Sequence, residues 1–235
     1  ESVLICFSAF SFQRYDFIEK IIRLDFPFFD FFFDSLSIHI NNFVLIIDTI
    51  SRFYQTSCFA RDQILSNLTS RGGLISIIRL IYKTGISDMK IYAFSNFLSN
   101  ISAFPIQKIA LFDDIFDCLD SILQSSFNSS FLPIARTVSN ILLNLLNPNY
   151  ISRKGEENIE YIIDSFNSHF IIDNLFDKMD ENEDLIKYVC VSAGLLRYKS
   201  NINDRINLPK IVNLINSTDD SIVISSSRCF ADFCF

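Results

Sequence analysis

The sequence is poor in the residues that most catalytic and cofactor-binding motifs require. Its 235 residues include no Trp, two His and five Gly. The glycines form neither a GxGxxG sequence nor a Walker loop, which are the backbone turns that hold phosphates. His39 and His169 lie far apart, and neither stands in an HExxH or triad-like motif. We therefore predict that the protein is not an enzyme, has no catalytic residues and uses no cofactor.

Ordered metal-ligand spacing is also missing. The acidic clusters at 177–184 (DKMDENED), 113–114 and 219–220 lack the spacing and the central Gly of an EF-hand. Asp is favoured at helix N-termini in any case, because it caps them. The six cysteines are scattered, mostly within apolar runs, at Cys6, Cys58, Cys118, Cys190, Cys229 and Cys234. We predict no metal site, and free thiols in a reducing compartment, with the cytoplasm as the expected location and the nucleus as a second one.

Long apolar runs and basic stretches are absent. A membrane span needs about 18 apolar residues, and the most apolar segment, FPFFDFFFDSL, is interrupted by Asp30 and Asp34. The net charge is −7 and the basic residues are scattered, so we expect neither a membrane span nor nucleic-acid binding. The chain opens at Glu1 and stops in the apolar RCFADFCF, and we expect it to be a fragment of a longer chain.

What the sequence does contain is a repeated small residue inside apolar segments. The stretch YAFSNFLSNIS (92–102) carries a Ser-Asn pair at Ser95 and Asn96, and the pair returns at Ser139 and Asn140. Aligned segments place a small residue, here called the marker, at intervals of 37 to 53 residues. The markers are Ser8, Ser51, Ser95, Ser139, Ser192 and Cys229. Self-similarity at this period is typical of repeat architectures.

A second pattern recurs at a nearly constant sequence distance before the marker. An apolar set at positions i, i+3, i+4 and i+7, which is one buried face of a helix, begins 20 to 24 residues before each marker from Ser51 onward. The sets are Phe29, Phe32, Phe33 and Leu36; Leu74, Ile77, Ile78 and Ile81; Ile115, Cys118, Leu119 and Ile122; Ile172, Leu175, Phe176 and Met179; and Leu208, Ile211, Val212 and Ile215. Each repeat is thus predicted to contain two main helices.

Shorter helices are predicted before several of these sets, at 14–22, 59–68, 104–112 and 158–166. Turns are predicted where Gly, Asn or Asp gather, at 71–73, 82–86 and 217–221. The segment NPNYISRKGEE (147–157) is predicted to be an exposed loop that lengthens one repeat. Strand-like alternation is absent, which indicates an all-α chain.

Helix triplets of this length resemble the armadillo repeat family. The segments 71–102 and 206–234 each resemble that family's second and third helices, and Pro209 stands just inside the predicted helix start. The resemblance implies an all-α, right-handed armadillo-like solenoid, a superhelix of three-helix repeats. We expect one domain over residues 1–235, with about five full repeats plus partial flanks. A helix triplet cannot bury its own apolar face, whereas stacked neighbours can.

The resemblance also implies that the third helices line a concave groove that binds extended partner chains. Importin alpha and its relatives have Trp three residues before the marker and Asn one residue after it. The positions here hold Asp48 and Arg52, Tyr92 and Asn96, then Arg136 and Asn140, with Val189 and Ala193 following. Asn96 and Asn140 keep the amide, and Tyr92 replaces one Trp. Arg52 and Arg136 depart from the pattern and would repel a basic peptide.

These residues give the predicted partner-binding groove, which consists of Asp48, Arg52, Tyr92, Asn96, Arg136 and Asn140. The predicted function is a non-enzymatic scaffold that binds an extended peptide or partner protein along the groove. The first alternative is a divergent importin-alpha-like nuclear import adaptor. The second is a structural module that dimerises through an exposed apolar surface at the Phe-rich segment 26–33. The sequence leaves the partner and the oligomeric state open.

Overall fold

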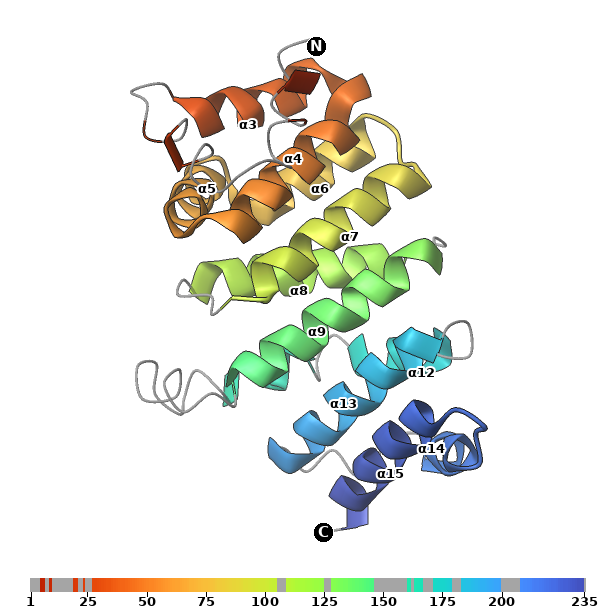
Figure 1. The fold of residues 1–235 in the computed structure, drawn as a ribbon. Coiled ribbons are helices and arrows are strands. Elements are labelled where there is room, and N and C mark those ends of the chain that lie inside the picture. Colours follow the sequence, from red (N-terminus) through yellow and green to blue (C-terminus); the bar gives the residue numbers. More distant parts are fainter. Residues whose placement is uncertain are drawn as a thin grey trace. The chain divides into compact units, whose positions relative to one another are not determined.

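Helices make up most of the residues that the computed structural model describes (Figure 1). These are 27–104, 109–124, 128–145, 160–161, 163–166, 171–178, 183–199 and 208–234, with a few residues before 27. The helices are α3 (Phe28–Ile38), α4 (Phe43–Thr56), α5 (Cys58–Ser70), α6 (Gly73–Lys83), α7 (Asp88–Ser102), α8 (Ile109–Leu123), α9 (Phe131–Leu145), α12 (Ile171–Lys178), α13 (Glu183–Lys199), α14 (Leu208–Ile215) and α15 (Asp220–Cys234), with the short 3-10 turns η1 (Ile40–Asn42) and η2 (Asn128–Ser130). No strand occurs in these ranges, so the all-α prediction is confirmed.

Internal contacts divide the chain into two compact units. The first compact unit comprises residues 1–101 and 108–118, and the second comprises residues 102–107 and 119–235. The first therefore contains α3 to α7 up to residue 101, and the second contains α9 and α12 to α15. The prediction of one repeat domain over residues 1–235 stays a prediction.

The first compact unit begins with an aromatic core between α3 and α4. Phe28, Phe29 and Phe32 of α3 meet the ring of Phe53 in α4 edge-on, at centroid separations of 5.2, 6.0 and 6.2 Å. Phe33 of α3 is buried as well. Because the four Phe side chains of α3 are in the core, the Phe-rich segment offers no exposed surface through them. The prediction of dimerisation at 26–33 is wrong for these residues.

The two Asp residues of this segment point away from that core. Arg71, at the end of α5, forms an ion pair with Asp30 at 3.1 Å and a second ion pair with Asp34. The alternation of Phe and Asp in α3 thus separates a buried face from an exposed face that is tied to α5. Helix α3 is therefore amphipathic, with its Phe face in the core and its Asp face outside it.

The predicted turns are present in the first compact unit. Gly72 and Gly73 have φ of 87° and 71° and lead into α6. Gly85, with φ of 92°, lies in the loop between α6 and α7. The Lys90 ammonium donates to the carbonyl of Gly85 at 3.0 Å and to that of Thr84 at 3.3 Å, so a side chain of α7 satisfies carbonyl groups at the end of α6.

The short predicted helices have mixed outcomes. The helix predicted at 59–68 lies within α5, and Glu160, Tyr161 and residues 163–166 of the predicted 158–166 helix are helical. The prediction of a separate helix at 104–112 is wrong for residues 109–112. These residues are helical, but they belong to α8, which continues to Leu123 and contains no Gly or Pro to end it earlier. Residues 105–108, most of 14–22, and the predicted loop 147–157 lie outside the described residues.

The second compact unit is arranged around α13. Helix α13 packs against both α9 and α15, while α12 packs on α9 and α13 and α14 packs on α15. The predicted apolar sets are confirmed at Ile172, Leu175 and Phe176, which are buried, and Met179 lies outside the described residues. In α14 only Ile211 is buried, and Val212 is 41% exposed, so the set predicted there is wrong at Val212.

A membrane-spanning helix is not found in the described part of the chain. No single described helix is both long and apolar enough to cross a bilayer. The helices Phe28–Ile38 and Ile40–Thr56 pass the same criteria only as a pair, and they are bent by 113° at their junction.

Candidate partner-binding surface

The marker residues are buried in every repeat that the structure describes. Ser51, Ser95, Ser139, Ser192 and Cys229 are all 5% exposed or less. The Ser95 hydroxyl donates to the carbonyl of Ile91 at 2.8 Å, and the Ser192 hydroxyl donates to that of Tyr188 at the same distance. Because each of these hydroxyls is satisfied one turn back in its own helix, both tolerate burial between helices. The marker therefore serves the fold.

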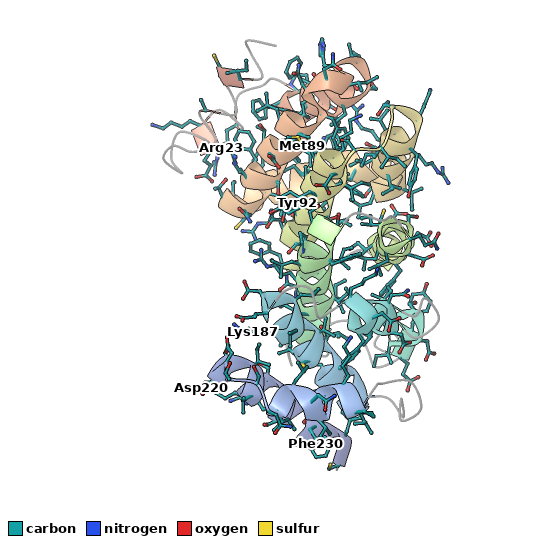
Figure 2. All side chains as sticks on the ribbon, turned by 90° about the vertical axis from the view of Figure 1, so that its right-hand side faces the viewer. Arg23, Met89, Tyr92, Lys187, Asp220 and Phe230 are labelled. Carbon is teal, nitrogen blue, oxygen red and sulfur yellow. The ribbon has the colours of Figure 1, made fainter. Side chains whose placement is uncertain are left out.

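In the first compact unit, the residue that follows the marker is more exposed than the marker itself. Asn96 of α7 is half-buried, and its side chain makes no hydrogen bond to another described residue. Tyr92 lies one turn earlier and is 45% exposed, and Met89 lies nearly one further turn back and is 69% exposed. Met89, Tyr92 and Asn96 thus follow one another along α7 at helical spacing, and Figure 2 labels the first two. We call these three residues the α7 stripe.

Helix α4, which lies beside α7, contributes two charged residues next to the α7 stripe. Asp48 and Arg52 of α4 are half-buried and stand one turn apart. Burial raises the pKa of the Asp48 carboxyl, and the Arg52 guanidinium partly offsets this rise. The two opposite charges on one turn of α4 stabilise each other, so this part of the surface carries little net charge.

A second asparagine of α7 joins the two helices. The Asn100 amide donates to the Ser51 hydroxyl, and its oxygen accepts from the Gln55 amide of α4. The buried Tyr54 hydroxyl donates to the Ile101 carbonyl at 3.4 Å, and burial raises the pKa of Tyr54 to about 12. Since Asn100 lies one turn after Asn96, and its partner Ser51 directly precedes Arg52, these bonds place the charged residues of α4 beside the α7 stripe.

The second compact unit contains the other two predicted residues. The Arg136 guanidinium of α9 lies 5.6 Å from the centroid of the Tyr188 ring in α13, a cation–π arrangement. The Asn140 amide donates to the Ser102 hydroxyl at 3.4 Å, and the Asn144 amide donates to the Ser102 carbonyl at 2.8 Å. Asn140 is therefore engaged within its own unit, unlike Asn96.

The sequence alignment fails in α13. Val189 and Ala193, at the positions of Tyr92 and Asn96, are fully buried. The half-buried Tyr188 and the 37% exposed Val191 stand on the accessible side instead. Helix α13 packs against α9 and α15 at once, and its accessible residues are offset from the positions that the alignment gives. Tyr188 was missed because the repeat alignment fixes the register by the marker alone.

The six predicted residues thus fall into two groups. Asp48, Arg52, Tyr92 and Asn96 lie in the first compact unit, on adjacent helices. Arg136 and Asn140 lie in the second. Among the residues that the structure describes, no group of three or more His, Cys, Asp or Glu side chains is placed to hold a metal ion. His39 is exposed, and a shallow open hollow there is lined by residues 38–42.

Comparisons with known proteins support the fold. No protein-family model matches the sequence, and no curated protein sequence matches it significantly. A designed armadillo repeat protein superposes with a TM-score of 0.69 at 13% sequence identity, over 99% of this chain and 92% of the designed one. The crystal structure of an engineered protein superposes with a TM-score of 0.65 at 12% identity, over 99% of this chain and 90% of that one. These likenesses confirm the fold that the repeat pattern predicts.

Proposed function

From its armadillo-like repeat fold and the α7 stripe, we propose that this chain is a non-enzymatic interaction module that binds an extended segment of a partner protein. The observation that carries the proposal is the pairing of an aromatic side chain, Tyr92, with an uncommitted amide, Asn96, on one exposed stripe. An extended peptide leaves its backbone N–H and C=O groups without partners. An Asn side chain supplies both a donor and an acceptor for them.

The neighbouring helix supports the same proposal. Asp48 and Arg52 flank the stripe with one charge of each sign, which suits a partner of mixed sequence. The contrast between Asn96 and Asn100 supports it too. Both belong to α7 and stand one turn apart, yet only Asn100 is hydrogen-bonded to α4. The fold uses Asn100, and Asn96 is available to a partner.

The stripe is tested with a selected ligand. A random peptide library is panned against the whole chain, and the affinity of a recovered peptide is measured by titration for the wild type, Asn96→Ala and Tyr92→Ala. We expect each substitution to weaken binding about tenfold or more, as for residues at the centre of an interface. Circular dichroism should report an unchanged fold for Asn96→Ala, because that side chain makes no hydrogen bond to a described residue.

The matched control is Tyr82→Ala. Tyr82 belongs to α6 and is 45% exposed, the same fraction as Tyr92. Its removal should leave the affinity unchanged within twofold. Equal losses for Tyr82→Ala and Tyr92→Ala, or full binding by Asn96→Ala, would contradict the assignment of the stripe.

A nuclear import adaptor is the second candidate. The exposed Tyr92 favours it, since it stands where importin alpha and its relatives have Trp. Arg52 and Arg136 count against it, because both stand at positions that would face a basic localisation peptide. Titration of a labelled Lys/Arg-rich peptide separates the two candidates: micromolar or tighter binding supports the adaptor and a shared cytoplasmic and nuclear location, whereas no binding supports the general module.

A further inference from the structure

Two buried cysteines meet between the last two long helices. Cys190 of α13 is fully buried and Cys229 of α15 is 1% exposed. The two helices pack against each other along the second compact unit (Figure 1). Cys229 stands at the marker position, which Ser occupies in the other described repeats. Like the other described markers, Cys229 is buried, and its helix packs on α13.

The backbone geometry brings the two sulfurs together. A Cβ placed on Gly194 of α13 would lie 3.7 Å from the Cα of Cys229, so the absence of a side chain at 194 lets α15 approach the α13 backbone. Cys190 stands one turn before Gly194 on the same face. The Cys229 thiol donates a hydrogen bond to the Cys190 sulfur, and the Gly194 backbone also reaches the Cys229 sulfur. A disulfide requires two cysteines whose Cα atoms are within about 7 Å and whose side chains face each other.

The two thiols are not equivalent. The hydrogen bond from Cys229 lowers the pKa of Cys190, even though burial opposes this. The same hydrogen bond, together with burial, raises the pKa of Cys229. When the pair loses its first proton, the proton that remains is therefore held by Cys229. Since the thiolate is the reactive form of cysteine, Cys190 is the nucleophile and Cys229 is the resolving thiol.

We propose that Cys190 and Cys229 form an oxidation site at which hydrogen peroxide closes a disulfide between α13 and α15. The Cys190 thiolate attacks one peroxide oxygen, the O–O bond breaks, and the leaving hydroxide takes up the proton that Cys190 released and becomes water. The sulfur of Cys229 then attacks the sulfur of the resulting Cys190 sulfenic acid. The S–S bond forms, the S–O bond breaks, and the hydroxide leaves as water with the Cys229 proton. Two thiols lose two electrons and two protons, and the peroxide is reduced to water.

The disulfide stabilises the second compact unit against unfolding. It encloses residues 190–229, including α14, in a covalent loop. Cross-linking a loop of about 40 residues restricts the unfolded chain and so raises the midpoint of unfolding. Because both sulfurs are buried in the folded chain, closure waits for local opening of α15 from α13, and the bond is then shielded from reductants.

Cys118 provides an internal comparison. It is buried in α8, where burial and the carboxylates of Asp114 and Asp117 raise the pKa of its thiol. Both effects keep that thiol protonated. Cys118 is therefore a buried cysteine that we expect to survive a peroxide treatment which oxidises Cys190.

The test uses the whole chain with its exposed cysteines, Cys6, Cys58 and Cys234, replaced by Ser. The folded protein is incubated with hydrogen peroxide, denatured in an alkylating agent, and mapped by mass spectrometry. We expect a linked peptide pair containing Cys190 and Cys229, an alkylated Cys118, and a thermal midpoint raised by several degrees. Adding Cys118→Ser should leave the linked peptide and the rise in thermal midpoint unchanged, and adding Cys229→Ser should leave a Cys190 sulfenic acid that a dimedone probe traps.

Two results would overturn the proposal. One is alkylation of both Cys190 and Cys229 after a treatment that oxidises Cys118. The other is a thermal midpoint that does not rise although the linked peptide is present, since the bond would then lie outside the native geometry. The linked peptide is read from the chain with its buried cysteines intact, so the test does not depend on whether Cys190→Ser or Cys229→Ser folds.

Discussion

At the scale of single residues, Asp114 determines how α6 begins. Its carboxylate, on α8, accepts a hydrogen bond from the backbone N–H of Leu74 at 2.8 Å. The neighbouring residue is Gly73, which has a positive φ of 71°. A Cβ at 73 would stand 1.7 Å from the Asp114 Oδ2 atom. One glycine thus permits both the turn and the cap, and the negative charge also suits a helix N-terminus.

We predict that Gly73→Ala destabilises the chain by about 3 kcal/mol, since it combines the cost of a positive φ with loss of the Asp114 hydrogen bond. The control is Gly85→Ala, where φ is 92° but nothing lies within 4 Å of the new Cβ. This control should cost only about 1–2 kcal/mol. Urea denaturation measures both, and equal losses would mean that the Asp114 contact contributes nothing.

Asp219 is a second residue whose environment gives a measurable prediction. Its carboxylate accepts hydrogen bonds from the Ser221 hydroxyl and from the backbone N–H groups of Ile222 and Ser221, which lower its pKa to about 2. An unfolded Asp titrates near a pKa of about 3.9. Because the folded-state pKa is the lower one, the carboxylate stabilises the fold above about pH 4, and this contribution is lost as the pH falls towards 2.

We therefore predict that the thermal midpoint of Asp219→Ala lies below that of the wild type at neutral pH, and that the difference shrinks between pH 4 and pH 2. The control is Asp220→Ala, which removes the same charge from the next position without these hydrogen bonds. Thermal melts followed by circular dichroism across this range make the measurement. A difference that stays constant down to pH 2 would show that the hydrogen bonds do not favour the charged form.

At the scale of elements, α3 and α4 are held together by aromatic packing. Phe53 of α4 is 1% exposed and contacts three rings of α3. Edge-to-face pairs add to the free energy gained by burying aromatic area. The chain uses Phe where many helical proteins use Leu, and here that choice produces a core of interlocking rings.

We predict that Phe53→Ala lowers the free energy of unfolding by about 3–5 kcal/mol, because it leaves a cavity among the rings of α3. Phe59 of α5 is 40% exposed, so Phe59→Ala should cost less than about 1 kcal/mol. Chemical denaturation with both variants provides the comparison. A small loss for Phe53→Ala would mean that the rings rearrange to fill the space.

At the scale of the whole molecule, the armadillo-like fold makes stability a local property. In a solenoid each repeat contacts only its neighbours, so a perturbation weakens with distance along the chain. The contacts here already separate into two compact units. Local unfolding should follow the same division.

We predict that Phe53→Ala increases amide hydrogen exchange strongly in α3 to α7 and weakly in α13 to α15. The reciprocal variant is Phe176→Ala in α12, whose ring is 3% exposed. It should affect α13 to α15 most. Hydrogen exchange followed by mass spectrometry resolves these segments, and uniform acceleration in either variant would mean that the chain unfolds as a single cooperative unit.

Much of this molecule could be predicted from its sequence, because periodicity reports burial directly. The apolar sets at helical spacing predicted the buried faces of α3, α6 and α12, and the recurring marker is a buried position in α4, α7, α9, α13 and α15. Gly72, Gly73 and Gly85 predicted turns because positive φ is strained for other residues. These features are local, so the sequence alone determined them.

Tertiary structure alone decided which polar side chains form hydrogen bonds or contacts within the protein. Asn96 and Asn100 are the same residue type, one turn apart in α7, yet only Asn100 meets a neighbour in α4. The burial of Val189 and Ala193, the pairing of Arg136 with Tyr188, and the meeting of Cys190 with Cys229 depend equally on how α13 packs between α9 and α15. The physical reason is that periodicity specifies which face of a helix is buried, whereas the partner of each side chain depends on a helix that lies far away in the sequence.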